Sequence, residues 1–106
     1  MLHDEGRDKI KKILGEQITF EGHFDLVFDN LKEKKQNELI SWINGCKEGL
    51  AIPISSEKEK GLLGFILKFR DTNFRAILTK KKNAYFIALF LDKHKYYERE
   101  RRELGL

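Results

Sequence analysis

Hydrophobic and polar positions alternate most clearly between residues 61 and 94. In residues 65–70, large apolar side chains occupy every second position, which is the period of two expected of a half-buried strand. Polar turn residues follow at 71–73, and a second alternating run occupies 74–79. Residues 84–91 are almost wholly apolar, which is typical of a central strand covered on both faces. The pattern predicts a three-stranded antiparallel meander.

Turn chemistry at Thr72-Asn73 sets the expected register of the first hairpin. With these two residues at the tip, Arg70 faces Arg75 and Lys68 faces Ile77. A slip of one residue would turn half of the apolar side chains toward water, so a loop with an even number of residues is favoured. One face of the hairpin then carries these apolar side chains: Phe65, Leu67, Phe69, Phe74, Ala76 and Leu78.

The opposite face of this hairpin collects three cations, Lys68, Arg70 and Arg75. Like charges directly opposite each other destabilise a sheet. The small side chain of Ala88 comes beside them across a loop expected at residues 80–83. This combination favours a shallow floor prepared for an anion. The alternative is a charged strand face that is simply solvated.

Helical periodicity is found in the first half of the chain. Apolar stripes at residues 24–31 and 39–43 predict two helices, or one bent helix, on the apolar face of the sheet. Residues 1–15 predict an extra, polar N-terminal helix that ends at a glycine. A short strand is expected at residues 17–20 and a connecting loop at residues 49–60.

Length, charge and cysteine content narrow the class of protein. A chain of 106 residues makes one domain, expected as an α+β fold with the meander and a short N-terminal strand packed on two helices. Residues 1–56 carry a net charge of −2 and residues 57–106 carry +6, a footprint typical of proteins that meet polyanions and also of lysine-rich surfaces. Cys46 is alone, and no apolar run approaches the roughly 18 residues of a membrane span. We therefore expect a cytoplasmic protein with no membrane partner.

The segment that follows the last predicted strand concentrates reactive groups. It contains an imidazole, two amines and two phenols in Lys93, His94, Lys95, Tyr96 and Tyr97. An imidazole can give or take a proton near neutral pH. With cations for the phosphate and a ring to stack on a base, the set fits phosphodiester chemistry. The alternative is a strand end without a catalytic role. The metal-ligand and nucleotide-binding motifs are absent, so neither a metal nor a cofactor is expected.

Residues 50–103 resemble the RelE/ParE superfamily of toxin–antitoxin toxins, which includes HigB-like and Gp49-like branches. The pair Phe74-Arg75, which opens a strand after a tight polar turn, is the most recognisable step. The family fold has a short first strand, two helices and a three-stranded meander. The resemblance is carried by residues 60–62, 66–70, 73–78, 85–91 and 92–95.

The resemblance implies a small basic endoribonuclease that cuts messenger RNA, usually on the ribosome, and is silenced by a cognate antitoxin protein. It implies in-line attack of the ribose 2′-hydroxyl on the adjacent phosphorus without a metal ion. Arg75 would steady the phosphate, Lys68 would act as base or charge stabiliser, and His94 would protonate the leaving 5′-oxygen. The substrate-binding residues would be Arg70, Lys93, Lys95, Tyr96 and Tyr97, with a tyrosine stacked on a base.

Two features depart from the family pattern. The frequent Glu-Leu-Arg step of the first meander strand is Ile66-Leu67-Lys68 here, and the helix in residues 1–15 is extra. Related ParE-type proteins inhibit DNA gyrase on the same fold and lack the nuclease residues. A gyrase inhibitor and a non-catalytic basic interaction domain therefore stay open as alternatives, while His94 beside two tyrosines favours the nuclease.

Overall fold

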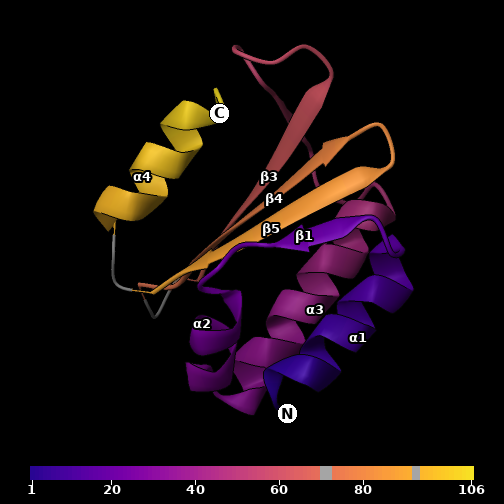
Figure 1. The fold of residues 1–106 in the computed structure, drawn as a ribbon, viewed down its shortest axis with the longest axis vertical. Helices are drawn as coiled ribbons and strands as arrows, with labels where there is room; N and C mark the ends of the chain where they lie inside the picture. Colours follow the sequence, from indigo (N-terminus) through magenta and orange to yellow (C-terminus); the bar gives the residue numbers. More distant parts are fainter. Residues whose placement is uncertain (70–72, 92–93) are drawn as a thin grey trace.

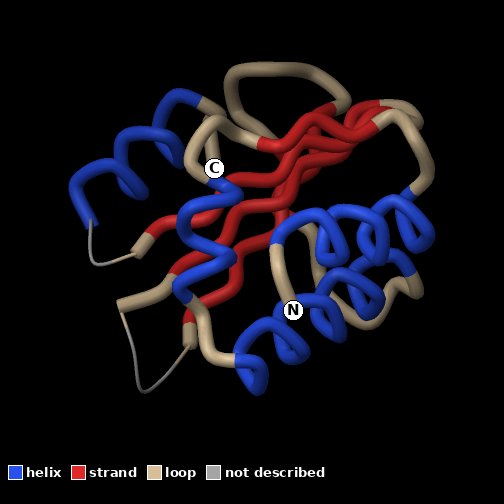
Figure 2. Tube along the Cα trace, turned by 60° about the horizontal axis from the view of Figure 1, so that its bottom comes forward, coloured by secondary structure: helices blue, strands red, loops and turns tan. Residues whose placement is uncertain are grey.

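A single mixed β-sheet separates two helical layers (Figures 1 and 2). The structure is a computed structural model that describes residues 1–69, 73–91 and 94–106; of residues 94 and 95 it describes the backbone alone. Helices α1, α2 and α3 lie on one face of the sheet, and α4 lies on the other (Figure 1). The domain is therefore α+β, as expected.

Within the described residues, the sheet has five strands in the order β1-β5-β4-β3-β2. Strand β1 runs parallel to β5, and the other neighbours are antiparallel. The expected antiparallel meander is present as β3, β4 and β5. The expected sheet lacked strand β2 and the parallel pairing of β1 with β5. Strand β2 forms inside the presumed loop, and the long connection between β1 and β5 permits their parallel pairing. The strand bounds are β1 Ile18–Phe20, β2 Ile54–Ser55, β3 Leu62–Lys68, β4 Arg75–Lys81 and β5 Ala84–Phe90.

The register of the first hairpin keeps the expected faces but differs from the expected pairs. Lys68 lies opposite Arg75, not opposite Ile77. The predicted register is therefore wrong by two residues; β3 ends at Lys68 and β4 begins at Arg75. A shift of two leaves every side chain on its own face. Arg70, which was expected opposite Arg75, lies outside the described residues.

The second hairpin shows the same kind of difference. Lys81 pairs with Ala84, so Lys82 and Asn83 alone form the turn in place of the expected loop of residues 80–83. Lys82 adopts a φ of 56°, a left-handed conformation that tight hairpin turns require. Ala88 still lies on the face that was predicted for it, opposite Ile77.

The predicted apolar face of the sheet forms the core together with α2 (Phe24–Asn30) and α3 (Glu33–Lys47). Its centre is fully buried, with Phe74 at 0% exposure. The prediction that this face is covered is confirmed. The core residues from this face are Phe65, Phe69, Phe74, Ala76 and Leu78, with half-buried Leu67 packed against them.

Helix α1 (His3–Leu14) is an integral part of the helical layer and not an appendage. It buries Ile10 and Leu14 in the same core. Gly6 permits its close packing, because the Phe28 ring occupies the space that a β-carbon at position 6 would need. This contact explains why a helix of polar composition is held against α2.

Gly6→Ala should destabilise the fold by about 1–3 kcal/mol, the usual cost of overpacking. Alanine is the better helix former by roughly 1 kcal/mol, but the overlap with the Phe28 ring outweighs this gain. Gly45→Ala in α3 is the matched control, since its β-carbon would meet nothing closer than 3.9 Å. Chemical denaturation should show a lower midpoint for Gly6→Ala and an equal or higher one for Gly45→Ala. Two variants of equal stability would contradict the packing argument.

An ion pair ties the start of α1 to α2. The Nδ1 atom of His3 lies 2.7 Å from Oδ2 of Asp29. This hydrogen bond raises the pKa of His3 above 6.5 and lowers the pKa of Asp29 below 3.8. Stability contributed by His3 is complete below pH 6.5 and is lost as the pH rises through its folded pKa, whereas that of Asp29 is lost as the pH falls through its own.

His3→Gln should therefore cost the most stability between about pH 4 and pH 6, where both partners are charged. The backbone N–H of His3, which donates to Asp29 Oδ1 at 2.8 Å, is retained in this variant. Urea denaturation of both proteins at pH 5.5 and pH 8.5 measures the effect. A stability difference that grows toward pH 8.5 would have the wrong sign for this pair.

Helix α4 (His94–Glu103) and the residues after it cover part of the second face of the sheet. The Tyr97 ring packs edge-on against Phe90 at 5.8 Å between centroids. Beyond the helix, Ser56 Oγ donates to the carbonyl of Leu104 at 2.6 Å, and the Leu106 side chain lies against Gly64. No helix within the described parts of the chain is both long enough and apolar enough to span a membrane.

Candidate nucleic-acid interface

The end of the sheet at which β5 leads toward α4 (Figure 1) carries a row of three residues. Lys68 ends β3, Arg75 begins β4 and Phe90 ends β5. Backbone pairing sets Arg75 opposite Lys68 on one side and opposite Phe90 on the other. Directly opposed residues point to the same face of a sheet, and Phe90 contacts Tyr97 of α4. The three side chains therefore share the α4 face, as expected for Lys68 and Arg75.

The position of Arg75 is fixed by its buried neighbour in the chain. Phe74 is fully buried, and its ring lies 4.7 Å from that of Phe69 between centroids. Arg75 itself is half-buried, and its Nη1 donates to the carbonyl oxygen of Phe74 at 2.9 Å. The backbone of Arg75 is therefore held in place by a buried apolar neighbour. A fixed backbone helps to preorganise an anion-binding side chain.

The Lys68–Arg75 pair carries the electrostatic argument. Two cations that face each other across a strand pair repel one another, and Lys68 is exposed to solvent. An anion that lies on this face of the sheet can accept charge-assisted hydrogen bonds from cations of this kind. The geometry therefore fits a phosphate group lying on the sheet surface.

Sequence reasoning missed two further residues at this end of the sheet. Phe90 completes the row, and its even position on the last strand would have revealed it once the register was known. Lys35 of α3 places its ammonium 4.9 Å from the centroid of the Phe69 ring. It lies in a polar stretch that separates two apolar stripes, and no pattern in the sequence marks it.

Half of the predicted site residues cannot be located by their side chains. Arg70 and Lys93 lie outside the described residues. For His94 and Lys95, the structure describes only the backbone, which begins α4 a few residues after β5 ends. This end of α4 therefore lies near the end of the sheet that carries the Lys68–Arg75 pair (Figure 1).

The two tyrosines that follow occupy different environments. Tyr96 is 51% exposed, and the Arg99 guanidinium carbon lies 5.2 Å from its ring centroid. Tyr97 is 3% exposed, and within the described chain its buried hydroxyl has no hydrogen-bond partner. A base can stack only on an exposed ring, so Tyr97 in this position is a packing residue and Tyr96 is the tyrosine available for stacking.

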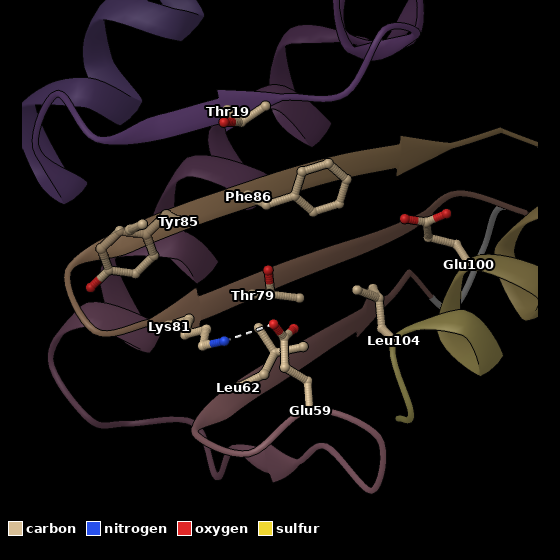
Figure 3. Close-up of a pocket in the computed structure, with 10 residues that line it drawn as sticks. Thr19, Glu59, Leu62, Thr79, Lys81, Tyr85, Phe86, Glu100 and Leu104 are labelled. Atoms are coloured by element: carbon tan, nitrogen blue, oxygen red, sulfur yellow. Dashed lines mark hydrogen bonds and ion pairs between the residues drawn. The ribbon is translucent and has the colours of Figure 1, made fainter.

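A hollow of about 380 Å³ lies between α4 and the sheet (Figure 3). Thr79 and Phe86 line its floor, and Leu104 of the segment after α4 lies at one side. The Nζ atom of Lys81 meets Oε1 of Glu59 at 2.7 Å at its margin. These groups are mostly apolar or already paired, so the hollow offers no obvious phosphate site.

A larger groove of about 720 Å³ lies between α2 and α4. Its lining includes Tyr96 and Phe90 but not Lys68 or Arg75, and the hollow in Figure 3 also excludes these two cations. A nucleic acid bound by the Lys68–Arg75 pair would therefore lie across an open surface and not inside either cavity.

The described residues give little support for a metal site or a reactive cysteine. Residues 1–69, 73–91 and 94–106 contain no group of three or more His, Cys, Asp or Glu side chains that could hold a metal ion. Burial raises the pKa of the Cys46 thiol to about 12, which leaves almost no reactive thiolate at neutral pH. Cys46 is therefore a core residue.

Comparison of the chain with protein-family models, with curated proteins and with solved structures found no match in any of the three. Inference about function therefore depends on the residues and their geometry, together with the resemblance noted in the sequence.

Proposed function

We propose that the protein is the toxin of a type II toxin–antitoxin system and that it cuts messenger RNA as a metal-independent endoribonuclease, with the ribosome as the usual setting. The observation that carries the proposal is the pairing of Lys68 directly opposite Arg75. The order of a short strand β1, helices α2 and α3, and the meander β3–β5 matches the layout that the resemblance implies. Helices α1 and α4 stand at either end of this layout.

In the proposed reaction, the 2′-oxygen of a ribose forms a bond to the adjacent phosphorus while the bond from phosphorus to the 5′-oxygen breaks. Lys68 takes the 2′-hydroxyl proton or stabilises the charge, and Arg75 binds the phosphate oxygens as their negative charge grows. His94 gives a proton to the leaving 5′-oxygen. The products are a 2′,3′-cyclic phosphate and a free 5′-hydroxyl. Tyr96 supplies the exposed ring on which a neighbouring base can stack.

A cognate antitoxin would silence the toxin by covering the Lys68–Arg75 pair or by drawing the C-terminal segment out of place. Arg70, Lys93 and Lys95 would add cations to the same RNA contact.

The test is expression of the wild-type protein under an inducible promoter, followed by mapping of messenger RNA ends in cells and in a translation extract with and without EDTA. The proposal expects growth arrest, new ends that carry a 5′-hydroxyl, and cleavage that survives the chelator. Growth arrest with intact messenger RNA and damaged DNA would instead identify a gyrase inhibitor. If messenger RNA and DNA both stay intact, the result would instead support a non-catalytic basic interaction domain.

Binding of single-stranded RNA should weaken steeply as salt is added, because each neutralised phosphate releases counterions. If Lys68 and Arg75 each neutralise one phosphate, the double variant Lys68→Ala/Arg75→Ala should reduce the slope of log K against log salt by about 1.4. Fluorescence anisotropy of a labelled RNA between low and moderate salt measures both slopes. An unchanged slope in the double variant would place the RNA elsewhere on the surface.

A further inference from the structure

The groove between α2 and α4 exposes apolar side chains from three separate segments. Leu26 of α2 is 66% exposed, Leu91 just beyond β5 is 42% exposed, and Tyr96 of α4 is 51% exposed. Val27 and Phe90 line the groove beside them. Contiguous apolar surface with a polar rim is characteristic of interaction sites, whereas single exposed apolar residues are ordinary. We call this surface the α2–α4 groove.

The rim of the α2–α4 groove is acidic, although the protein as a whole carries a net charge of +4. Three carboxylates line it, from Glu21, Glu100 and Glu103. Burial, followed by the nearby charges of Glu103 and Glu21, raises the pKa of Glu100, so a cation beside this carboxylate would be favoured. The other titratable groups of the rim are partly occupied, since His23 lies 2.9 Å from a Glu21 oxygen and Arg99 lies over the Tyr96 ring.

The charge and shape of the groove select among possible occupants. A nucleic acid is disfavoured because its phosphates would face three carboxylates. A purely apolar ligand would leave the Glu100 carboxyl, which has Glu21 and Glu103 as neighbours, without a cationic partner. An amphipathic helix can satisfy both features, because one stripe of its surface can carry aliphatic side chains and an adjoining Lys or Arg. Helix α4, which forms one wall, has 10 residues, so it spans about 15 Å.

We propose that the α2–α4 groove binds an amphipathic helical segment of a protein partner, two to three turns long, whose aliphatic stripe covers Leu26, Leu91 and Tyr96 and whose Lys or Arg pairs with Glu100. This inference is independent of the ribonuclease proposal, since the groove excludes both Lys68 and Arg75. The groove does share Phe90 with the row that contains those cations. A bound segment would therefore lie beside the proposed RNA contact.

The experiment selects 12-residue peptides from a random displayed library against the purified full-length protein. Enriched sequences should carry aliphatic residues at i, i+3 or i+4 and i+7 together with at least one Lys or Arg. One enriched peptide is then synthesised with a fluorescent label, and its affinity is measured by anisotropy for wild type, Leu26→Ser and Glu100→Gln. We expect binding roughly tenfold weaker for Leu26→Ser, as for a buried anchor, and roughly fivefold weaker for Glu100→Gln.

Leu50→Ser is the matched control, because Leu50 is 82% exposed and does not line the groove. It should bind the peptide as wild type does. Leu26 is exposed, so its replacement should leave the thermal midpoint unchanged, and circular dichroism checks this.

Three results would overturn the proposal. Enrichment of acidic peptides, or of no peptides, would contradict the claim that the groove binds a helix carrying aliphatic residues and a Lys or Arg. Equal affinity of wild type and both groove variants would place the peptide elsewhere. Self-association of the wild type that Leu26→Ser abolishes would show that the occupant is a second copy of this chain. The ribonuclease assay is read separately, so failure of either proposal can be told from failure of the other.

Discussion

Replacing Arg75 with alanine is expected to slow RNA cleavage by roughly a hundred- to a thousandfold, which corresponds to about 2.7–4 kcal/mol. The reason is that the proposed reaction builds negative charge on the phosphate, and the proposed role of Arg75, which follows the buried Phe74, is to bind that charge. A donor that is already in place loses no reorganisation energy when the charge develops. Single-turnover cleavage of a defined messenger RNA in a translation extract measures the rate.

The matched control for Arg75→Ala is Lys12→Ala, which removes the same charge from an exposed position on α1. This control should cut as fast as wild type. His94→Ala should lose a factor of about 10² to 10⁴ if its imidazole is the proton donor. If His94→Ala cuts RNA as fast as wild type, another group must transfer the proton. If Arg75→Ala cuts RNA as fast as wild type, Arg75 does not bind the phosphate and the proposed function loses its main support.

Replacing Phe74 with alanine is expected to lower the free energy of unfolding by about 3–5 kcal/mol. Its side chain is fully buried, and its ring packs against Phe69 with 4.7 Å between centroids. The loss combines the transfer of the ring to water with the cavity that it leaves. Since a domain of this kind has only about 5–15 kcal/mol of stability, guanidinium denaturation should show a large fall in the midpoint.

Phe86→Ala gives the comparison for Phe74→Ala. Phe86 is half-buried on the opposite face of the sheet, where it lines the hollow under α4 (Figure 3). Because this ring already contacts solvent, its removal should cost clearly less than the removal of Phe74. Equal losses would mean that the two faces of the sheet contribute alike and that the Phe69–Phe74 contact has no special weight.

The faces of the meander could be predicted from the sequence, whereas its pairings could not. Alternation with a period of two fixes which side chains lie together, so Phe65 and Ala76 were placed in the core correctly. The same alternation is blind to a shift of two residues. Lys68 was therefore expected opposite Ile77, although it lies opposite Arg75. The actual pairing sets Lys68 opposite Arg75, where the expected register had set Arg70.

Long-range features were beyond the reach of local patterns. Strand β1 pairs with β5. Its three residues are too few to indicate from the sequence which strand they pair with. Tyr97 was expected as a candidate for stacking on a base, yet its burial against Phe90 depends on how α4 returns over the sheet. A charged helix gives little indication of such a path, because its few apolar residues form no long stripe.

The strand that is synthesised last lies inside the sheet, between β1 and β4. Residue 18 pairs with residue 85, so the sheet cannot close while the ribosome still holds the second half of the chain. Until β5 emerges, the apolar sides of Ile10, Phe28 and Leu39 can cover only the part of the sheet that β2, β3 and β4 form. In such a nascent chain β1 has no partner strand, although β2, β3 and β4 can already pair with one another.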